Sequence, residues 1–147
     1  MSRNFGMLLV SLSLAVAAPL GAQETAAPAG KVMLELNGAV DTETGACRLT
    51  VVTTNRLDQA IQRAAWQVAI FDRQGVVQSL PILDFGGMIA GKTKVAMFEL
   101  PERKCADIGR IVVNDVAECS GPDNTDLRDI CLGGLATQTR TDIDFGL

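Results

Sequence analysis

Apolar and polar residues alternate with a period of two along most of this sequence, a pattern that restricts the chain to extended strands with one buried face. The clearest run covers residues 47–55, where Cys47, Leu49, Val51 and Thr53 share one face. The other runs that alternate are 31–37 with Val32, Leu34 and Leu36 on one face, 65–72 with Trp66, Val68 and Ile70, 75–85, 92–100 with Val95 and Met97, 110–119 and 137–145. Seven short strands separated by turns predict a β-sandwich.

Turn and breaker residues mark several boundaries. Residues 72–75, Asp-Arg-Gln-Gly, predict a type I turn closed by Gly75 in the left-handed conformation. Pro81 interrupts the run 75–85, and because proline has no backbone N–H to donate, we expect this strand at a sheet edge. The last run is expected to form one strand, with these residues on one face: Thr137, Thr139, Thr141, Ile143 and Phe145.

Residues 55–65 depart from the alternation. Leu57, Ile61 and Ala65 follow helical spacing, and Asn55 or Asp58 is available as a helix cap. We therefore expect a long connection that holds one helical turn, with a short helix of about two turns as the alternative. Residues 104–109 similarly predict a short helical turn before the strand at 110–119.

The N-terminal residues have the pattern of a secretory signal peptide. Arg3 provides a positive charge, residues 5–18 form an apolar stretch, and Ala22 is a small residue suited to a cleavage site, with Ala17 and Ala18 as alternatives. The stretch is shorter than the roughly 20 residues that a membrane-spanning helix needs. These features predict a signal peptide over 1–22, a flexible linker over 23–30 and a β-sandwich domain over 31–147. We expect a periplasmic or secreted protein that is not inserted in the membrane after cleavage.

Four cysteines follow the signal peptide: Cys47, Cys105, Cys119 and Cys131. An even number of cysteines in an exported chain predicts two disulfides. A zinc site is disfavoured because the chain has no histidine and no C-x-x-C motif. We therefore expect no metal and no cofactor.

Composition excludes several classes of function. The formal net charge is −4 and no Lys/Arg cluster is present, which argues against binding to nucleic acid. Without histidine, neither a Ser-His-Asp nor a Cys-His site can form. The acidic residues of the segment 123–129 fail the calcium-loop pattern because Leu127 and Arg128 occupy the fifth and sixth positions. Those acidic residues, and the pair Asp142 and Asp144, are expected to be solvated, and we predict no enzymatic activity.

The segment from about residue 36 to 100 resembles extracellular β-sandwich domains built around an F-x-L-Y-D motif. The matching elements are the strand 50–55, the segment 68–77 and the segment 90–100. Val68, Ile70, Phe71 and Asp72 occupy the motif positions, with valine for the first aromatic residue and phenylalanine for the tyrosine. The chain also resembles small exported proteobacterial proteins. This resemblance implies an immunoglobulin-like antiparallel sandwich of about seven strands in the cell envelope, without known catalysis.

An immunoglobulin-like strand order also implies how the cysteines pair. The start of the second strand and the loop before the sixth lie at one end of such a sandwich, which favours Cys47–Cys105. Cys119–Cys131 would then close the loop before the last strand. The alternative is Cys47–Cys119 packed on Trp66, as in antibody domains.

A non-enzymatic module that contacts another envelope macromolecule is the function we expect. Two contact surfaces are suggested: the sheet edge beside Pro81 and the loop between Cys119 and Cys131. Phe71 and Phe85 are weaker candidates for a contact surface, and core packing is the better explanation for both. A carrier that holds a small ligand in an apolar pocket between the sheets is the alternative. An enzyme that uses only carboxylates ranks last.

Overall fold

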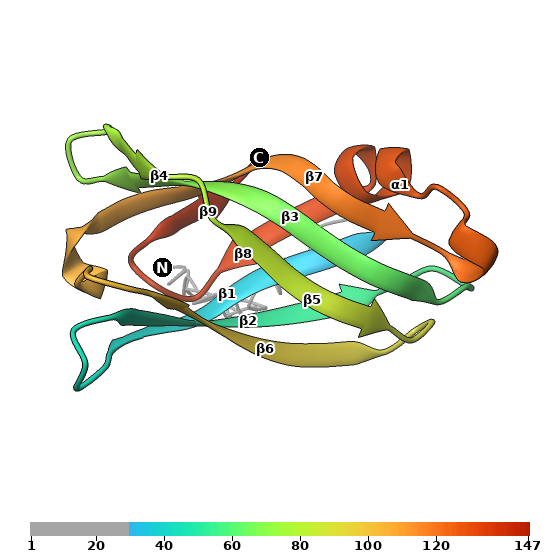
Figure 1. The fold of residues 1–147 in the computed structure, drawn as a ribbon, viewed down its shortest axis with the longest axis horizontal. Helices are drawn as coiled ribbons and strands as arrows, with labels where there is room; N and C mark the ends of the chain where they lie inside the picture. Colours follow the sequence, from blue (N-terminus) through green and yellow to red (C-terminus); the bar gives the residue numbers. More distant parts are fainter. Residues whose placement is uncertain (1–29) are drawn as a thin grey trace, which may run out of the picture.

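The computed structural model describes residues 30–147, which form two β-sheets packed face to face (Figure 1). The predicted signal peptide over 1–22 and the linker residues 23–29 lie outside the described residues. The elements of the described part are β1 (Val32–Asp41), β2 (Cys47–Asn55), β3 (Ile61–Asp72), β4 (Val77–Ser79), β5 (Ile82–Met88), β6 (Thr93–Leu100), a 3-10 turn η1 (Cys105–Asp107), β7 (Ile108–Ser120), a second 3-10 turn η2 (Pro122–Asn124), α1 (Arg128–Gly133), β8 (Leu135–Thr139) and β9 (Asp144–Gly146).

The two sheets confirm the predicted β-sandwich. One sheet, here called sheet A, has the order β6-β2-β1-β8, and the other, sheet B, has the order β4-β3-β7-β9 with β5 also paired to β3. Strands β1, β2, β3, β6 and β7 pair in the antiparallel sense that was expected. Two pairs are parallel, β1 with β8 and β7 with β9, so the sandwich is not purely antiparallel.

The core lies between the sheets, and in β1, β2 and the second half of β3 it is built from the faces that the alternation predicts. In β6 the apolar residues named from the alternation, Val95 and Met97, are exposed, and Ala96 and Phe98 pack against the core instead. The inward side chains of β1, β2 and β3 are all buried: Val32, Leu34, Leu36, Cys47, Leu49, Val51, Thr53, Trp66, Val68 and Ile70. Trp66 has no exposed surface, and its ring meets that of Phe85 edge to face at 5.4 Å between centroids. Phe85 in turn meets Phe98 of sheet A at 5.0 Å. A chain of three aromatic rings therefore links the two sheets.

The segment 55–65 is not helical, and both helical interpretations of it are wrong. β3 begins at Ile61, which pairs with Met88 of β5 and is buried in the core. The register shifts on either side of Ala64, and such bulges break the two-residue alternation that identifies a strand. Asn55 caps a turn instead of a helix, since its side chain accepts a hydrogen bond from Leu57 N and donates to Gln59 O.

The run 137–145 does not form one strand, because the chain leaves sheet A after Thr139 and joins sheet B at Asp144. Two threonine hydroxyls explain the break. Thr139 Oγ1 accepts a hydrogen bond from Thr141 N, and Thr141 Oγ1 accepts one from Ile143 N, each at 3.1 Å. Local side-chain bonds of this kind offer the backbone an alternative to a strand ladder.

Other turn predictions are confirmed. Gly75 has φ of 81°, and its N–H donates to Asp72 O in the predicted turn. Pro81 separates β4 from β5, and both short strands pair only with β3, at the edge of sheet B. The helical turn expected within 104–109 is η1, whereas the one α-helix of the described residues, α1, contains Cys131.

We predict that Trp66→Ala lowers the free energy of unfolding by about 3–5 kcal/mol, because it removes the largest core side chain and leaves a cavity. Urea denaturation of the oxidised chain measures the loss. Val40→Ala is the control, since Val40 is exposed and its truncation should change stability by less than about 0.5 kcal/mol. An unchanged midpoint for the Trp66 variant would contradict this account of the core.

Candidate functional site

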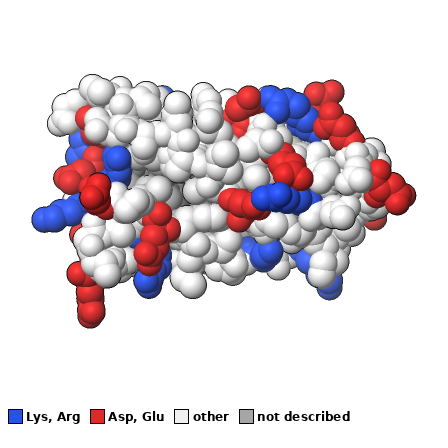
Figure 2. Space-filling view, viewed as in Figure 1, with Lys and Arg blue, Asp and Glu red and all other residues white. Residues whose placement is uncertain are grey.

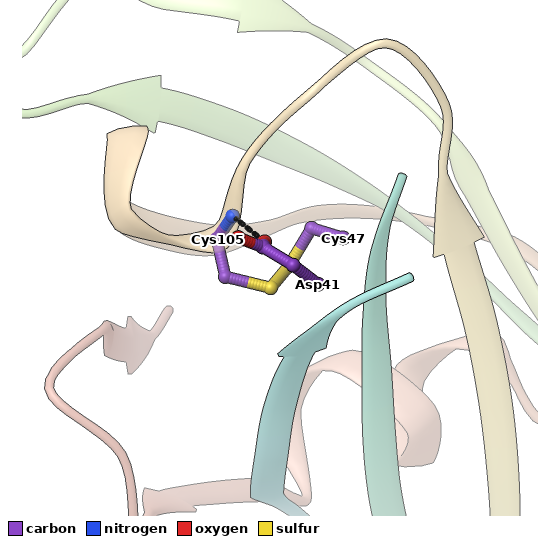
Figure 3. Close-up of side chains that lie close together, drawn as sticks. All are labelled: Asp41, Cys47 and Cys105. Carbon is purple, nitrogen blue, oxygen red and sulfur yellow. Dashed lines mark hydrogen bonds between the residues drawn. A yellow bond between two sulfur atoms is a disulfide. The ribbon is translucent and has the colours of Figure 1, made fainter. Parts of the chain in front are cut away.

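One group of potential metal-ligating side chains comes together within residues 30–147: Asp41, Cys47 and Cys105 (Figure 3). Asp41 ends β1, Cys47 begins β2, and Cys105 begins η1. The two sulfurs form a disulfide with a Cα–Cα distance of 4.9 Å. Asp41 Oδ1 accepts a hydrogen bond of 2.7 Å from Cys105 N.

This arrangement is structural and does not hold a metal ion in the oxidised chain. Metal ions bind thiolate sulfur, and both thiols here are consumed in the disulfide. The Asp41 carboxylate is directed at the first N–H of η1, so it fixes the backbone next to the disulfide (Figure 3). The group therefore fastens the segment before β7 to the hairpin between β1 and β2.

The second disulfide joins Cys119, near the end of β7, to Cys131 in α1, with a Cα–Cα distance of 6.4 Å. Cys131 is buried, and its carbonyl oxygen accepts a hydrogen bond of 2.9 Å from Trp66 Nε1. Both disulfides are the pairs that the immunoglobulin-like order favours, and Cys47 and Cys119 are not joined to each other. They lie at opposite ends of β3, since Ala64 pairs with Cys119 whereas Asp72 pairs with Ile108, directly after η1.

The acidic residues of the segment 123–129 and the pair Asp142 and Asp144 lie on the surface. Asp123, Asp129, Asp142 and Asp144 are exposed, and Asp126 uses Oδ1 to accept a hydrogen bond from Arg128 N. None of these residues belongs to the one ligand group found within residues 30–147. They are solvated or serve local turns.

Sequence reasoning missed a buried carboxylate on the outer face of sheet A. Glu35 of β1 accepts hydrogen bonds from Asn37 Nδ2 at 2.7 Å and Arg140 Nε at 2.8 Å, and also from Gln138 Nε2. The hydrogen bond from Arg140 is the main cause that holds the pKa of Glu35 below its ordinary value, against the opposing effect of burial. In the sequence, Glu35 is visible only as a polar residue of an alternating run. Gln138, which β8 brings beside it, follows 103 residues later, so the sequence does not show that the two residues are neighbours.

The edge beside Pro81 presents apolar side chains to solvent. Leu80 and Ile82 are 51% and 57% exposed, and Val77 is also exposed. A surface hollow of about 380 Å³ lies next to them, lined by Ser79, Leu80, Pro81, Glu99, Leu100, Pro101 and Arg103. Isolated exposed apolar residues are ordinary, whereas several at one sheet edge are candidates for a contact surface. We call Val77, Leu80, Ile82 and this hollow the β4–β5 surface.

The two phenylalanines weighed as contact residues have different environments. Phe85 is buried in the aromatic chain of the core. Phe71 is partly buried, and the guanidinium of Arg110 lies 6.0 Å from its ring centroid. Neither belongs to the β4–β5 surface.

Several surface hollows lie around the sandwich within residues 30–147, and neither Trp66 nor the fully buried side chains of β1 and β2 line these hollows. These hollows offer no support for a ligand pocket between the sheets. Charged residues form small groups of both signs in the view of Figure 2, with uncharged surface between them. Within the described residues no helix has the length and apolar character needed to cross a membrane.

Comparison with known proteins supports the fold alone. The chain matches no protein-family model and no curated protein. Among solved structures, IrmA from Escherichia coli is similar, with a TM-score of 0.56 and 10% sequence identity over 74% of this chain and 91% of IrmA. A likeness at this identity shows that both chains share a sandwich architecture.

The two disulfides should stabilise the chain unequally. On the chain-entropy model, the Cys47–Cys105 loop contributes about 4 kcal/mol and the shorter Cys119–Cys131 loop about 3 kcal/mol. We expect the double variant Cys47→Ala/Cys105→Ala to lose the larger amount when each pair is replaced and unfolding is measured in urea. A larger loss for the Cys119/Cys131 pair would show that this disulfide also holds α1 in the position where Cys131 O accepts the hydrogen bond from Trp66.

Acid should weaken the fold partly through Glu35. Because the pKa of Glu35 is lower in the folded chain, its contribution to stability is complete above its ordinary pKa of 4.5 and is lost as the pH falls through the folded-state value. The variant Glu35→Gln lacks this titration, so its unfolding midpoint should fall less steeply below pH 4.5 than that of the unmodified chain. Thermal unfolding at a series of pH values measures both slopes, and equal slopes would contradict the assignment.

Proposed function

We propose that this chain is a non-enzymatic binding module of the cell envelope, periplasmic or secreted, that contacts another envelope macromolecule through the β4–β5 surface. The main support for this proposal is that Leu80 and Ile82 are exposed beside a hollow lined largely by apolar side chains. Two disulfides support an oxidising compartment, where such bonds form and persist. The resemblance to F-x-L-Y-D domains and the signal-peptide pattern support the envelope as its location.

The chemistry of the β4–β5 surface fits a protein partner. Leu80, Pro81, Leu100 and Pro101 supply apolar walls, while Glu99 and Arg103 add charges of both signs at the rim. Apolar contacts at the centre with polar groups around them are the usual anatomy of a protein interface. A short edge strand broken by proline gives little backbone for strand pairing, so side chains would provide most of the affinity.

Affinity capture tests this function. The exported chain is used as bait in a native envelope extract, with chemical cross-linking and mass spectrometry, and a disulfide-scrambled sample controls for the fold. We expect one stoichiometric partner whose cross-links map to the β4–β5 surface. Its recovery should fall about tenfold or more with Leu80→Lys/Ile82→Lys, because two apolar contacts are replaced by charge.

Val40→Lys is the matched control, since Val40 is equally exposed but lies on β1, outside the β4–β5 surface. It should leave capture unchanged. The proposal fails if no partner is recovered, or if the partner is retained equally by the scrambled sample or by the Leu80/Ile82 variant.

A further inference from the structure

Strand β6 forms an edge of sheet A, near the β4–β5 surface. It is the longest of the edge strands in the two sheets. Within residues 30–147 it pairs only with β2, over eight residues without a register shift. Its companion across the sandwich is β5, which runs beside it (Figure 1). An unbroken edge strand presents a row of backbone groups to which another strand can pair.

The backbone groups that face the open edge can be identified. Asn55 N donates to Lys92 O, so the pair formed by these two residues is hydrogen bonded. In an antiparallel ladder, hydrogen-bonded pairs recur at every second residue, which assigns the bonds with β2 to Lys94, Ala96, Phe98 and Leu100. The N–H and C=O groups directed away from β2 are therefore those of Thr93, Val95, Met97 and Glu99.

The same alternate residues expose apolar side chains. Val95 and Met97 are 60% and 67% exposed, whereas Ala96 and Phe98 pack against the core. Val95 and Met97 project from the outer face of sheet A. In β5 the side chain of Leu83 points into the core. The neighbouring side chain of Ile82 therefore projects from the outer face of sheet B.

Devices that commonly block strand pairing are missing from this edge. The strand contains no proline and no bulge. Lys94 would be such a device, but its ammonium group donates to Phe85 O at 2.5 Å and Gly87 O at 3.2 Å of β5. The ammonium group of Lys94 is thus directed at β5, where it joins the two sheet edges, although the residue remains exposed.

We propose that β6 pairs in the antiparallel sense with β6 of a second copy of this chain, so that sheet A continues across a twofold axis. The strand is self-complementary in one register, with Ala96 opposite Ala96 of the second copy. That register places Val95 opposite Met97 and Thr93 opposite Glu99. It also pairs all four residues whose backbone groups face the open edge, whereas a shift of two residues in either direction leaves some of them without a partner.

The distribution of charged residues along β6 also favours a second copy of this chain as the partner. Lys92 lies just before β6, and Glu99 and Glu102 lie at or just beyond its end. Antiparallel pairing brings the basic start of each copy beside the acidic end of the other. Glu99 is already paired with Arg48 at 2.7 Å, but both side chains are about half exposed and remain accessible to a second cation.

Sedimentation of the purified exported chain over a range of concentrations tests the proposal. We expect a reversible monomer–dimer equilibrium that the double variant Val95→Lys/Met97→Lys weakens roughly 100-fold, because it removes apolar contacts and sets lysines opposite each other. Ile82→Lys on the β4–β5 surface is the matched control and should leave the equilibrium unchanged. Circular dichroism and thermal unfolding confirm that each variant folds, since all the replaced side chains are exposed.

A second variant tests the register. Ala96→Cys should yield an oxidised dimer in which the two introduced cysteines are joined, as shown by mass mapping, whereas Thr50→Cys on the neighbouring strand should not. A chain that stays monomeric at about 100 µM, or a dimer that the lysine variant leaves intact, overturns the proposal. An edge occupied only by a different protein also overturns it. Because the capture experiment relies on Leu80 and Ile82, either proposal can fail while the other stands.

Discussion

The packing of Trp66 is the interaction on which the rest of the structure depends. Its ring lies on β3, the strand to which β4, β5 and β7 all pair, and it meets Phe85 of the same sheet. The ring of Phe85 in turn contacts the ring of Phe98 in sheet A. The indole N–H, which would be costly to bury alone, is satisfied by Cys131 O. One side chain thereby fixes the spacing of the sheets and the position of α1.

Alternation alone was sufficient to predict the inward faces of β1, β2 and the second half of β3, because nearly every second side chain in these segments is apolar and faces the other sheet. It was not sufficient for Ile61, where bulges around Ala64 disturb the period and produce helical spacing by coincidence. Nor did it reveal the crossing between sheets after Thr139. The alternation continues through that crossing, and only the hydroxyl bonds of Thr139 and Thr141 show where the strand ends.

The candidate contact surfaces were less accessible to sequence reasoning than the core. Pro81 correctly indicated an edge, but an apolar residue in an alternating run can face the core or solvent, and Val95 and Met97 face solvent. The orientation of β6 depends on its pairing with β2 and on Phe98 reaching Phe85 across the core. Glu35 is similar, since two of its three hydrogen-bond donors, Gln138 on the parallel strand β8 and Arg140 just after it, come from the far end of the chain. Contacts between distant segments have no local signature.

The parallel pairing of β1 with β8 has a mechanical consequence. Val32, at the start of β1, lies opposite Leu135, at the start of β8, and Leu36 lies opposite Thr139. A pull that draws the two ends of the sandwich apart would slide these strands along each other, so the hydrogen bonds between them would share the load and would not open one at a time. The Cys47–Cys105 bond would limit how far the segment between those two residues could extend after the strands part.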